Sequence, residues 1–294
     1  MLTARYARDE LKGRSVYYQG MTDEPRRHET YTHGHAPATV RQHGQRTAEE
    51  AAAFLLPELR AGMRVLDVGC GPGSITRGLA ERVAPGEVIG LDLSRETLAA
   101  ARRDAAARGL VNLHYQEGSV YELPFPDASF DVAYAHQVLQ HLRERGAALR
   151  EMLRVVRPGG LVAVRDVDWG TAAYWPRDPW LDRFIDVHLR TWSQNGGEPL
   201  MGRQLRALFS AAGVADLKIS ATVWCYATPG ETTEWGESYA DRLLTSPMGQ
   251  HPIEHGHASR ADIEAMAAAF RAWAAHPDAF WVFTHVAALG RKVG

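Results

Sequence analysis

A glycine-rich turn between a strand pattern and a helix pattern constrains the fold of this chain most strongly. The stretch VLDVGCGPGSITRGLA covers residues 65–80, and Asp67 is followed there by three glycines within five positions. Glycine lets the backbone turn tightly and approach a ligand without a Cβ atom in the way. Such a turn is a typical ligand-binding loop at the carboxyl end of a strand in an open α/β sheet.

Strand and helix patterns alternate regularly around this turn, which predicts βαβ units and a parallel sheet covered by helices on both faces. A helix is expected over residues 47–59, with Thr47 as its N-cap. Strand patterns then cover residues 64–70, 87–94, 112–119, 130–137 and 161–169, with helical patterns over 76–83, 96–109 and 142–156.

The pattern changes after Trp169, where helical segments become frequent. Helices are expected over residues 180–192, 204–213 and 262–275, and strands over 215–226 and 279–292. We therefore expect an α/β fold with a doubly wound, Rossmann-like, mostly parallel sheet of seven strands. The expected domains are an N-terminal cap (1–46), a ligand-binding core (47–170), and a helical lid with the last two strands (171–294).

The acids around the glycine turn indicate the kind of ligand. The glycines have the spacing G-x-G-x-G, not the G-x-G-x-x-G of dinucleotide sites, and no phosphate-binding G-x-x-x-x-G-K-[ST] occurs at this turn. Asp67 would repel a pyrophosphate but suits a cationic amino group. Asp92, at the end of the next strand, is placed to bind both hydroxyls of a ribose. The ligand that fits is a nucleoside with an amino acid end and no phosphate.

Four ordered motifs carry a resemblance to a known family: VLDVGCGPG, LDLS, LPFPDASFDVAYAHQVLQHL and RVVRPGG. Together they resemble the class I S-adenosylmethionine-dependent methyltransferases, and the branch that includes the ubiquinone and menaquinone C-methyltransferases. The resemblance covers about residues 45–170. It implies that S-adenosylmethionine is the cofactor, whose ribose, amino group and sulfonium match the ligand expected from the acids.

The resemblance also implies which residues bind the cofactor. Gly69, Cys70, Gly71 and Gly73 would wrap its methionine and ribose, with Asp67 at the amino group and Asp92 at the ribose. Leu93 would lie against the adenine, and three residues would read the adenine edge: Gly118, Ser119 and Val120. The chain departs from the family pattern at Ser119, where an acid is common.

Three further residues are assigned to the same site. His136 and Gln137 match the segment at the sulfonium end, or they simply form a turn. Arg46 precedes the first helix, where it could pair with the carboxylate of the cofactor or lie on the surface as a solvated arginine.

Aromatic residues are abundant in the lid, so we expect it to receive a flat, π-rich acceptor. Trp169 and Tyr174 follow the carboxyl end of a strand and are candidates for the acceptor pocket, together with Tyr18 and Phe283. Trp192 and Trp273 lie on the apolar faces of helices, which favours a place in the core.

Histidines cluster in YTHGHAPATVRQH and in HPIEHGH, but no cysteine or H-E-x-x-H pattern completes a metal site, so we expect no metal. HPIEHGH is expected to be a solvated loop. A methyltransferase sometimes needs a base, and our hypothesis is that His35, His33 or His285 removes a proton from the acceptor. Tyr31 or Asp168 would orient that base. His285 is also compatible with a core position, and positioning alone could suffice.

Three classes of function remain open on these grounds. The first is methylation of carbon or oxygen on an indole, phenol or quinol in specialised metabolism, with a prenylated quinone as the alternative acceptor. The second is methylation of a nucleic acid or protein, which the absence of an Asn/Asp-Pro-Pro-aromatic motif and the charge balance disfavour. The third is a module that binds the cofactor without turnover.

Composition sets the remaining limits. The chain has 294 residues and a net charge of −2, which gives no basic footprint for nucleic acid. We expect no membrane span and a cytoplasmic location, because residues 1–14 lack the apolar core of a secretion signal. Cys70 and Cys225 are expected to be free thiols. Apolar lid helices and the N-terminal segment are compatible with a homodimer.

Overall fold

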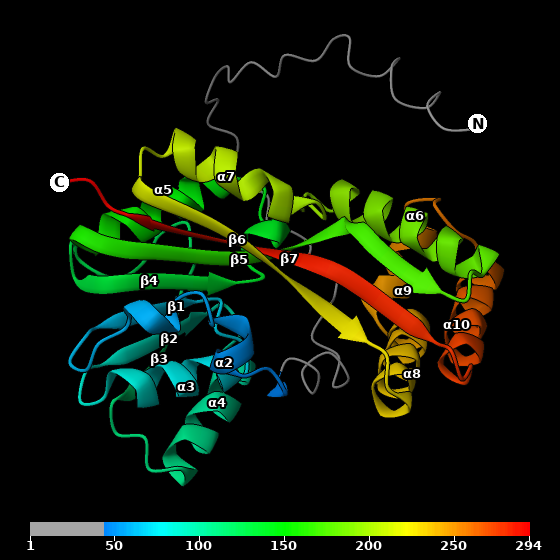
Figure 1. Ribbon diagram of the computed structural model, residues 1–294, viewed down its shortest axis with the longest axis horizontal. Helices are drawn as coiled ribbons and strands as arrows, with labels where there is room; N and C mark the ends of the chain where they lie inside the picture. Colours follow the sequence, from blue (N-terminus) through cyan, green and yellow to red (C-terminus); the bar gives the residue numbers. More distant parts are fainter. Residues whose placement is uncertain (1–43) are drawn as a thin grey trace.

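The computed structural model describes residues 44–294 and is built on a seven-stranded sheet with the strand order β3-β2-β1-β4-β5-β7-β6 (Figure 1). β7 runs antiparallel to both of its neighbours, whereas the pairs from β3 to β5 are parallel. In chain order the strands are β1 Val65–Val68, β2 Val88–Asp92, β3 Leu113–Glu117, β4 Phe130–His136, β5 Val156–Trp175, β6 Ala215–Tyr226 and β7 Phe280–Arg291. This confirms the predicted α/β class and the mostly parallel sheet.

The central strands are mostly apolar because helices cover both of their faces. All four residues of β1 are buried. One apolar cluster joins one face of the sheet to α2, α3 and α4, and a second joins the other face to α5 and α7. These helices are α2 Ala48–Ala51, α3 Ser74–Val83, α4 Arg95–Ala107, α5 Arg145–Val155 and α7 Met201–Ala211.

The remaining helices form a lid beside the far ends of β5 and β7 (Figure 1). They are α6 Pro179–Gln194, α8 Pro229–Thr245, α9 Pro247–Glu254 and α10 Arg260–Ala274. A third apolar cluster unites them with the sheet, and Phe184, Trp192, Phe270 and Trp281 in it are almost completely buried. Burial of each such side chain stabilises the fold by about 2–3 kcal/mol.

The helix expected over residues 47–59 is much shorter in the structure. α2 ends at Ala51 after its Thr47 cap, and the chain then forms a short 3₁₀ turn, Leu56–Glu58. Pro57 cannot donate a helical hydrogen bond and restricts the residue before it. Leu55 is fully buried, so tertiary packing outweighs helix propensity in this segment.

The HPIEHGH segment is not a loop, because α9 includes its first residues, His251 to Glu254. Asn195, which caps α6, lies 3.1 Å from Nδ1 of His251 through its Nδ2 and 2.8 Å from Nε2 of His255 through its Oδ1. These histidines therefore join α9 to α6. Within residues 44–294, no group of three or more histidine, cysteine or acidic side chains is arranged to hold a metal ion.

Two expectations from composition can be compared directly with the structure. Cys70 and Cys225 are free thiols, as predicted. Among the helices of the described residues, none combines the length and the apolar character needed to cross a membrane.

Candidate active site

The loop after β1 turns through three glycines with positive φ angles, 69° at Gly69, 53° at Gly71 and 76° at Gly73. A Cβ atom on Gly69 would lie 2.5 Å from Cγ2 of Val138, so no larger residue fits there. A Cβ atom on Gly71 would meet nothing within 4 Å. The loop therefore leaves open space beside the backbone of Gly71, as a ligand-binding turn requires.

Asp92, at the end of β2, fixes the loop by hydrogen bonds. Its Oδ2 accepts a hydrogen bond from the backbone N–H of Gly71, and its Oδ1 accepts one from Ser94, both at 2.9 Å. Each carboxylate oxygen can accept a further hydrogen bond, so Asp92 can bind a ribose diol while it holds the loop. Leu93, beside it, is 73% exposed and offers apolar surface to an adenine ring.

Asp67, in β1, is a buried acid beneath the loop. Thr76 donates a hydrogen bond of 2.6 Å to its Oδ2. Burial raises the pKa of the Asp67 carboxyl from its ordinary value of 3.8 to about 7, and the hydrogen bond from Thr76 opposes this only in part. A buried carboxyl of this kind is stabilised in its charged form by a cation, which the amino group of a bound amino acid would provide.

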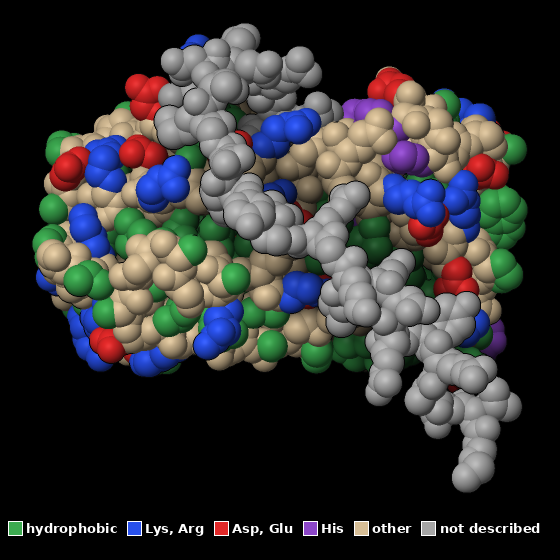
Figure 2. All heavy atoms as spheres, turned by 90° about the horizontal axis from the view of Figure 1, so that it is seen from above, with side chains coloured by type: hydrophobic (Ala, Val, Ile, Leu, Met, Phe, Trp, Pro, Cys, Tyr) green, Lys and Arg blue, Asp and Glu red, His purple; other side chains and the backbone are tan. Residues whose placement is uncertain are grey.

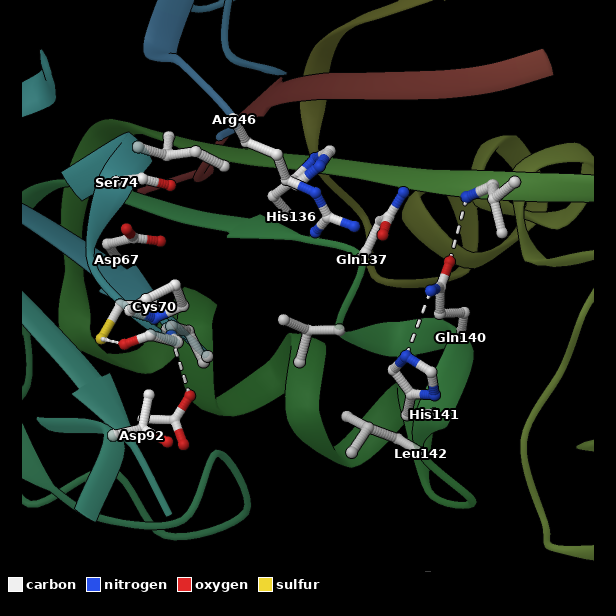
Figure 3. A pocket seen from close by; sticks show the side chains of 18 of the residues that line it. Arg46, Asp67, Cys70, Ser74, Asp92, His136, Gln137, Gln140, His141 and Leu142 are labelled. Atoms are coloured by element: carbon white, nitrogen blue, oxygen red, sulfur yellow. Dashed lines mark hydrogen bonds between the residues drawn. The ribbon is translucent and has the colours of Figure 1, made fainter. Parts of the chain in front are cut away.

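One pocket of about 260 Å³ joins these groups to the lid. Figure 3 shows Asp67, Cys70 and Asp92 at one end of it and Gln140 and His141 at the other. We call the first the cofactor end. The second is the acceptor end, which we define by the lining residues Gln140, His141, Val167, Trp169, Trp192, Trp224, Trp235, Tyr239, Arg242 and Phe283.

Most residues that the sequence assigned to the cofactor line this pocket. They are Arg46, Asp67, Gly69, Cys70, Gly71, Asp92, Leu93, Gly118, Val120, His136 and Gln137. Arg46 extends toward the middle of the pocket beside His136 (Figure 3). It is thus not merely a solvated surface residue, and it lies 5.4 Å from the centre of the Trp224 ring.

Two of the predicted cofactor residues do not line the pocket. Gly73 is the N-cap of α3, and a Cβ atom on it would clash with the hydroxyl of Tyr115, so its role is to let the loop pack. Ser119 forms its own local turn, in which its Oγ accepts a hydrogen bond from the backbone N–H of Tyr121. The neighbours of Ser119, Gly118 and Val120, line the adenine side instead.

The acceptor end is a cage of aromatic rings from the lid and the long strands. Trp169 and Phe283, which face each other across β5 and β7, stack with ring centres 5.0 Å apart at 10°. Trp235 of α8 lies 5.5 Å from Phe283. Trp192, expected in the core, is almost fully buried and also lines the pocket. The structure thus brings the predicted residues Trp169 and Phe283 together in the wall of the pocket.

Tyr174 does not reach the pocket. It stacks on Trp281 at 5.0 Å, and its hydroxyl lies 2.9 Å from the backbone oxygen of Asp178, at the start of α6. Tyr174 therefore anchors the lid. Trp273 is buried in the core, as expected, where its Nε1 donates a hydrogen bond to the backbone oxygen of Trp175.

His285 lies behind the pocket wall. It is completely buried, and its Nε2 is 2.7 Å from Nε2 of Gln137, which does line the pocket. Burial, followed by the nearby charges of Arg165 and Arg46, holds the pKa of His285 well below 6.5. Gln137 has a φ angle of 56°, rare for a residue with a side chain, so the turn after β4 is strained where it meets the pocket.

Asp168 does not orient His285. Its carboxylate binds Arg203 of α7 through two hydrogen bonds of 2.6 and 2.7 Å. Successive residues of a strand point to opposite faces, and its neighbours Val167 and Trp169 face the pocket. Asp168 therefore fastens α7 to the other face of the sheet.

Gln140 and His141 are functional candidates that the sequence reasoning missed, although they lie in the quoted motif QVLQHL. The Oε1 of Gln140 accepts a hydrogen bond from the backbone N–H of Val167 at 3.1 Å. The amide nitrogen of Gln140 then faces Nε2 of His141, 3.2 Å away. Burial lowers the pKa of His141 to about 3, so the ring is neutral, with the proton on Nδ1.

Arg242 was also missed, although the sequence carries a signal for it. Trp235, Tyr239 and Arg242 follow one another at helical spacing on the buried face of α8, so a charged residue interrupts an apolar stripe. Arg242 is only 3% exposed and lines the pocket. Buried charges are rare unless they are paired.

Four of the predicted residues lie outside the described part of the chain: Tyr18, Tyr31, His33 and His35. The same holds for most of the expected N-terminal cap (1–46), since only residues 44–46 of it are described.

Residues 66–164 match a family described as a methyltransferase domain. The chain is 37% identical over 225 residues to an uncharacterized methyltransferase of Schizosaccharomyces pombe, covering 74% of this chain and 80% of that protein. A probable methyltransferase of Aspergillus luteorubrus is 33% identical over 282 residues, which is 89% of this chain and 97% of that protein.

A further sequence relative and a solved structure are also similar to this chain. The demethylmenaquinone methyltransferase of Geobacillus stearothermophilus is 32% identical over 174 residues, 55% of this chain and 74% of that protein. Among solved structures, the YcgJ protein of Bacillus subtilis matches with a TM-score of 0.57 and 24% identity, covering 84% of this chain and 99% of that one. This last match supports the fold alone.

Proposed function

Since the chain belongs to the class I S-adenosylmethionine-dependent methyltransferases, we propose that it methylates carbon or oxygen of a small, electron-rich aromatic acceptor of the indole, phenol or quinol type. The single observation that carries the acceptor class is the aromatic cage at the acceptor end, continuous with the cofactor end of the same pocket. We assign the reaction to specialised metabolism.

The residues of the cofactor end fit S-adenosylmethionine. The space beside Gly71 admits the ligand backbone, Asp67 would bind its amino group, and Asp92 would bind its ribose. Arg46 would pair with its carboxylate. When bound, the cofactor would supply an electrophilic methyl group on a cationic sulfur atom, and the sulfur would keep the electron pair of the broken C–S bond.

The chain itself contributes alignment and exclusion of water. Trp169 and Phe283 would hold the acceptor ring by stacking, and Trp224 and Trp235 would close the sides of the cage. Aromatic faces also favour a cationic sulfonium. A flat acceptor stacked against this cage would lie next to the cofactor end without any covalent step on the protein.

The hypothesis that His33, His35 or His285 accepts a proton remains a proposal. For His285 the geometry disfavours direct transfer, because the ring lies behind Gln137 and its Nδ1 has no hydrogen-bond partner among the described residues. Single-turnover methylation by His33→Ala, His35→Ala and His285→Asn tests the three residues. Full rates in all three variants would mean that the enzyme works by positioning alone.

A prenylated quinone is the second candidate acceptor, and the similarity to a demethylmenaquinone methyltransferase favours it. A nucleic acid fits less well, since Lys and Arg side chains are interspersed with Asp and Glu on the face seen in Figure 2 and the net charge is −2. A cytoplasmic location and a homodimer stay part of the proposal.

The test combines cofactor binding with an acceptor panel. Calorimetry should show heat with S-adenosylmethionine and none with NAD. Incubation with methyl-labelled cofactor and a panel of indoles, phenols, quinols and prenylated quinols should transfer the label to one of the small aromatic classes. Label transfer only to prenylated quinols would replace the first candidate by the second. No transfer to any aromatic compound, despite cofactor binding, would refute both.

A further inference from the structure

The ends of β5, β6 and β7 that carry the aromatic cage have one face toward the lid and leave the other face open. Trp224 and Phe283 line the pocket, and Trp281 belongs to the apolar cluster of the lid. Successive residues of a strand point to opposite faces, so the residues between these aromatics point away from the lid. We call this second surface the open face and define it by six side chains: Trp175, Ala221, Val223, Cys225, Phe280 and Val282.

Strand pairing places the side chains of the open face next to one another. Trp175 pairs with Phe280 across β5 and β7, and Cys225 pairs with Val282 across β6 and β7. Val223 lies two residues before Cys225 and therefore on the same side of β6. Because paired residues of neighbouring strands share a face, the open face is one continuous surface. Figure 1 shows β6 and β7 side by side along this length.

The open face is apolar and accessible to water. Val223 is 61% exposed, Trp175 57% and Phe280 36%, and Ala221 and Cys225 are exposed as well. An antiparallel sheet that is covered on one side normally carries polar residues on its other side. Here all six side chains that define the face are apolar. An exposed apolar surface of this kind marks an interaction site.

α7 lies on the same side of the sheet but stops short of the open face. A Cβ atom on Gly202, the second residue of α7, would lie 3.1 Å from Cγ2 of Val286. Val286 pairs with Ala221, at the border of the open face. Beyond this border, the exposure of Val223 and Trp175 shows that no other element within residues 44–294 covers the strands.

The free edge of β6 argues against a lipid surface as the partner. β6 is the last strand in the order of the described sheet, so the backbone N–H and C=O groups along its outer edge have no neighbouring strand there. Hydrocarbon cannot satisfy such groups, whereas a protein partner can leave this edge in contact with water. The open face therefore fits a protein better than a membrane.

Charge and area favour a second copy of this chain as that protein. In a two-fold dimer the same patch of both copies meets, so a charge on the patch would face a like charge. The open face has no charged side chain. Its six side chains expose on the order of 400 Å², and a standard interface contains about 450 Å² of apolar surface per partner.

We infer that two copies of this chain associate through the open face, with the sheet of one copy packed on the sheet of the other around a two-fold axis. The inference rests on the homodimer of the proposed function and names its surface. On their opposite face, the same strands carry Trp169, Trp224 and Phe283 of the aromatic cage. The second copy would therefore support the strands behind the acceptor end of the pocket.

Sedimentation velocity of the full chain tests the inference. Wild type should sediment as a dimer at micromolar concentration. Val223→Lys should weaken association on the order of 100-fold or more, because two like charges would meet in a surface without water. The matched control is Val111→Lys. Val111 is 89% exposed and lies just before β3, at the opposite edge of the sheet, so this variant should remain a dimer.

Two further measurements support the comparison of these variants. Unchanged affinity for S-adenosylhomocysteine shows that a variant is folded, and if Val223→Lys does not bind it, Phe280→Lys on the same face must show the loss of the dimer. Cys225 is an exposed free thiol, whereas Cys70 is buried. A thiol reagent should therefore modify Cys225, and its rate should fall severalfold as the dimer forms in wild type and Val111→Lys, but not in Val223→Lys.

Several results would overturn the inference. A dimeric Val223→Lys variant would place the interface elsewhere, and the homodimer of the proposed function would stand. A monomeric wild type would refute the association itself. If Cys225 were then protected at every protein concentration, the open face would be assigned to residues 1–43 of the same chain. If wild type instead bound phosphatidylcholine vesicles and Val223→Lys did not, it would be assigned to a lipid surface. The acceptor panel alone decides the proposed methylation.

Discussion

The two ends of the pocket are built in different ways. The cofactor end consists mainly of backbone turns and acids at the carboxyl ends of neighbouring strands, in short stretches between residues 67 and 138. The acceptor end consists of side chains from the turn after β4 and from β5, α6, β6, α8 and β7, most of which are far apart in the sequence. A site made of backbone tolerates few changes, whereas a site made of side chains can change its ligand residue by residue. The following variants should separate the two ends.

The largest effect is expected from Asp92→Ala, which removes the hydrogen bonds to the loop and would remove the proposed ones to the ribose. Two hydrogen bonds to a charged group amount to about 3 kcal/mol, so cofactor affinity should fall about 100-fold. Calorimetry with S-adenosylmethionine measures this, with the exposed Asp278→Ala as control. If Trp235→Ala at the acceptor end weakened cofactor binding as much, the distinction between the ends would be lost.

The next effect is a pH dependence of cofactor binding. Burial raises the pKa of Asp67 to about 7, and the contact that we propose with the ammonium of the cofactor requires the ionised form of Asp67. Binding must therefore release a proton below pH 7, and affinity should fall on the order of tenfold per unit between pH 7 and 5.5. Asp67→Asn should bind weakly at every pH. A wild-type affinity independent of pH over this range would contradict the assignment.

Substitution of Gly69 should mainly lower stability, whereas substitution of Gly71 should mainly weaken cofactor binding. Gly69→Ala brings a Cβ atom against Val138 at a positive φ angle, and we expect about 2 kcal/mol lower stability in urea unfolding. Adding Val138→Ala to the Gly69→Ala variant should restore part of the lost stability. Gly71→Ala has open space and should cost only about 1 kcal/mol in stability, but it should weaken cofactor binding. Equal losses of stability in the Gly69→Ala and Gly71→Ala variants would show that the loop relaxes around the added Cβ atoms, which would contradict this prediction.

Asp168→Asn tests a residue that sequence reasoning placed in catalysis. The structure pairs it with Arg203, whose side chain is 52% exposed, so solvent screens the pair and the loss should be about 1 kcal/mol of stability. The methylation rate per folded molecule should be unchanged. If the variant kept full stability but methylated more slowly, Asp168 would have a role in catalysis after all.

The smallest effect is expected from Trp192→Phe. It keeps the ring that stacks on His141 but removes the hydrogen bond to the backbone oxygen of Gln140. Glu198 still donates to that oxygen at 2.7 Å, so stability should change by less than about 1 kcal/mol. The KM of the acceptor should rise a few-fold at constant cofactor affinity. A larger change in cofactor affinity than in KM would contradict the separation.

The sequence predicted most of the residues that line the cofactor end of the pocket, for a physical reason. A turn at the end of a strand needs glycines at fixed spacing, and the acids at strand ends follow from the same periodicity, so Asp67, Gly71 and Asp92 could be assigned without coordinates. Ser119 shows the limit of this reasoning: it occupies the expected position, but its hydroxyl satisfies its own turn.

The acceptor end could be predicted only in outline. Trp169 and Phe283 were assigned correctly to the pocket, but Tyr174, only five residues beyond Trp169, anchors α6 instead. A bend in the long strand decides between them, since the pairing of β5 with β7 shifts register between Asp168 and Ala173. No local sequence pattern indicates such a register shift. Arg242 could be recognised in the sequence as a charged residue on an apolar helix face. Its position at the pocket, however, depends on which strands α8 covers.

The pairing of β5 with β7 resumes beyond residue 170, where we had expected the core to end and the lid to begin: Asp168 pairs with Thr284 before the bulge, and Ala173 with Val282 after it. The two strands therefore connect the sheet and the lid on both sides of the bulge. The floor of the aromatic cage belongs to these paired strands, so room for acceptors of a new shape should come from its roof, where α8 contributes Trp235, Tyr239 and Arg242. Efforts to redirect this enzyme to other acceptors should begin with that one helix.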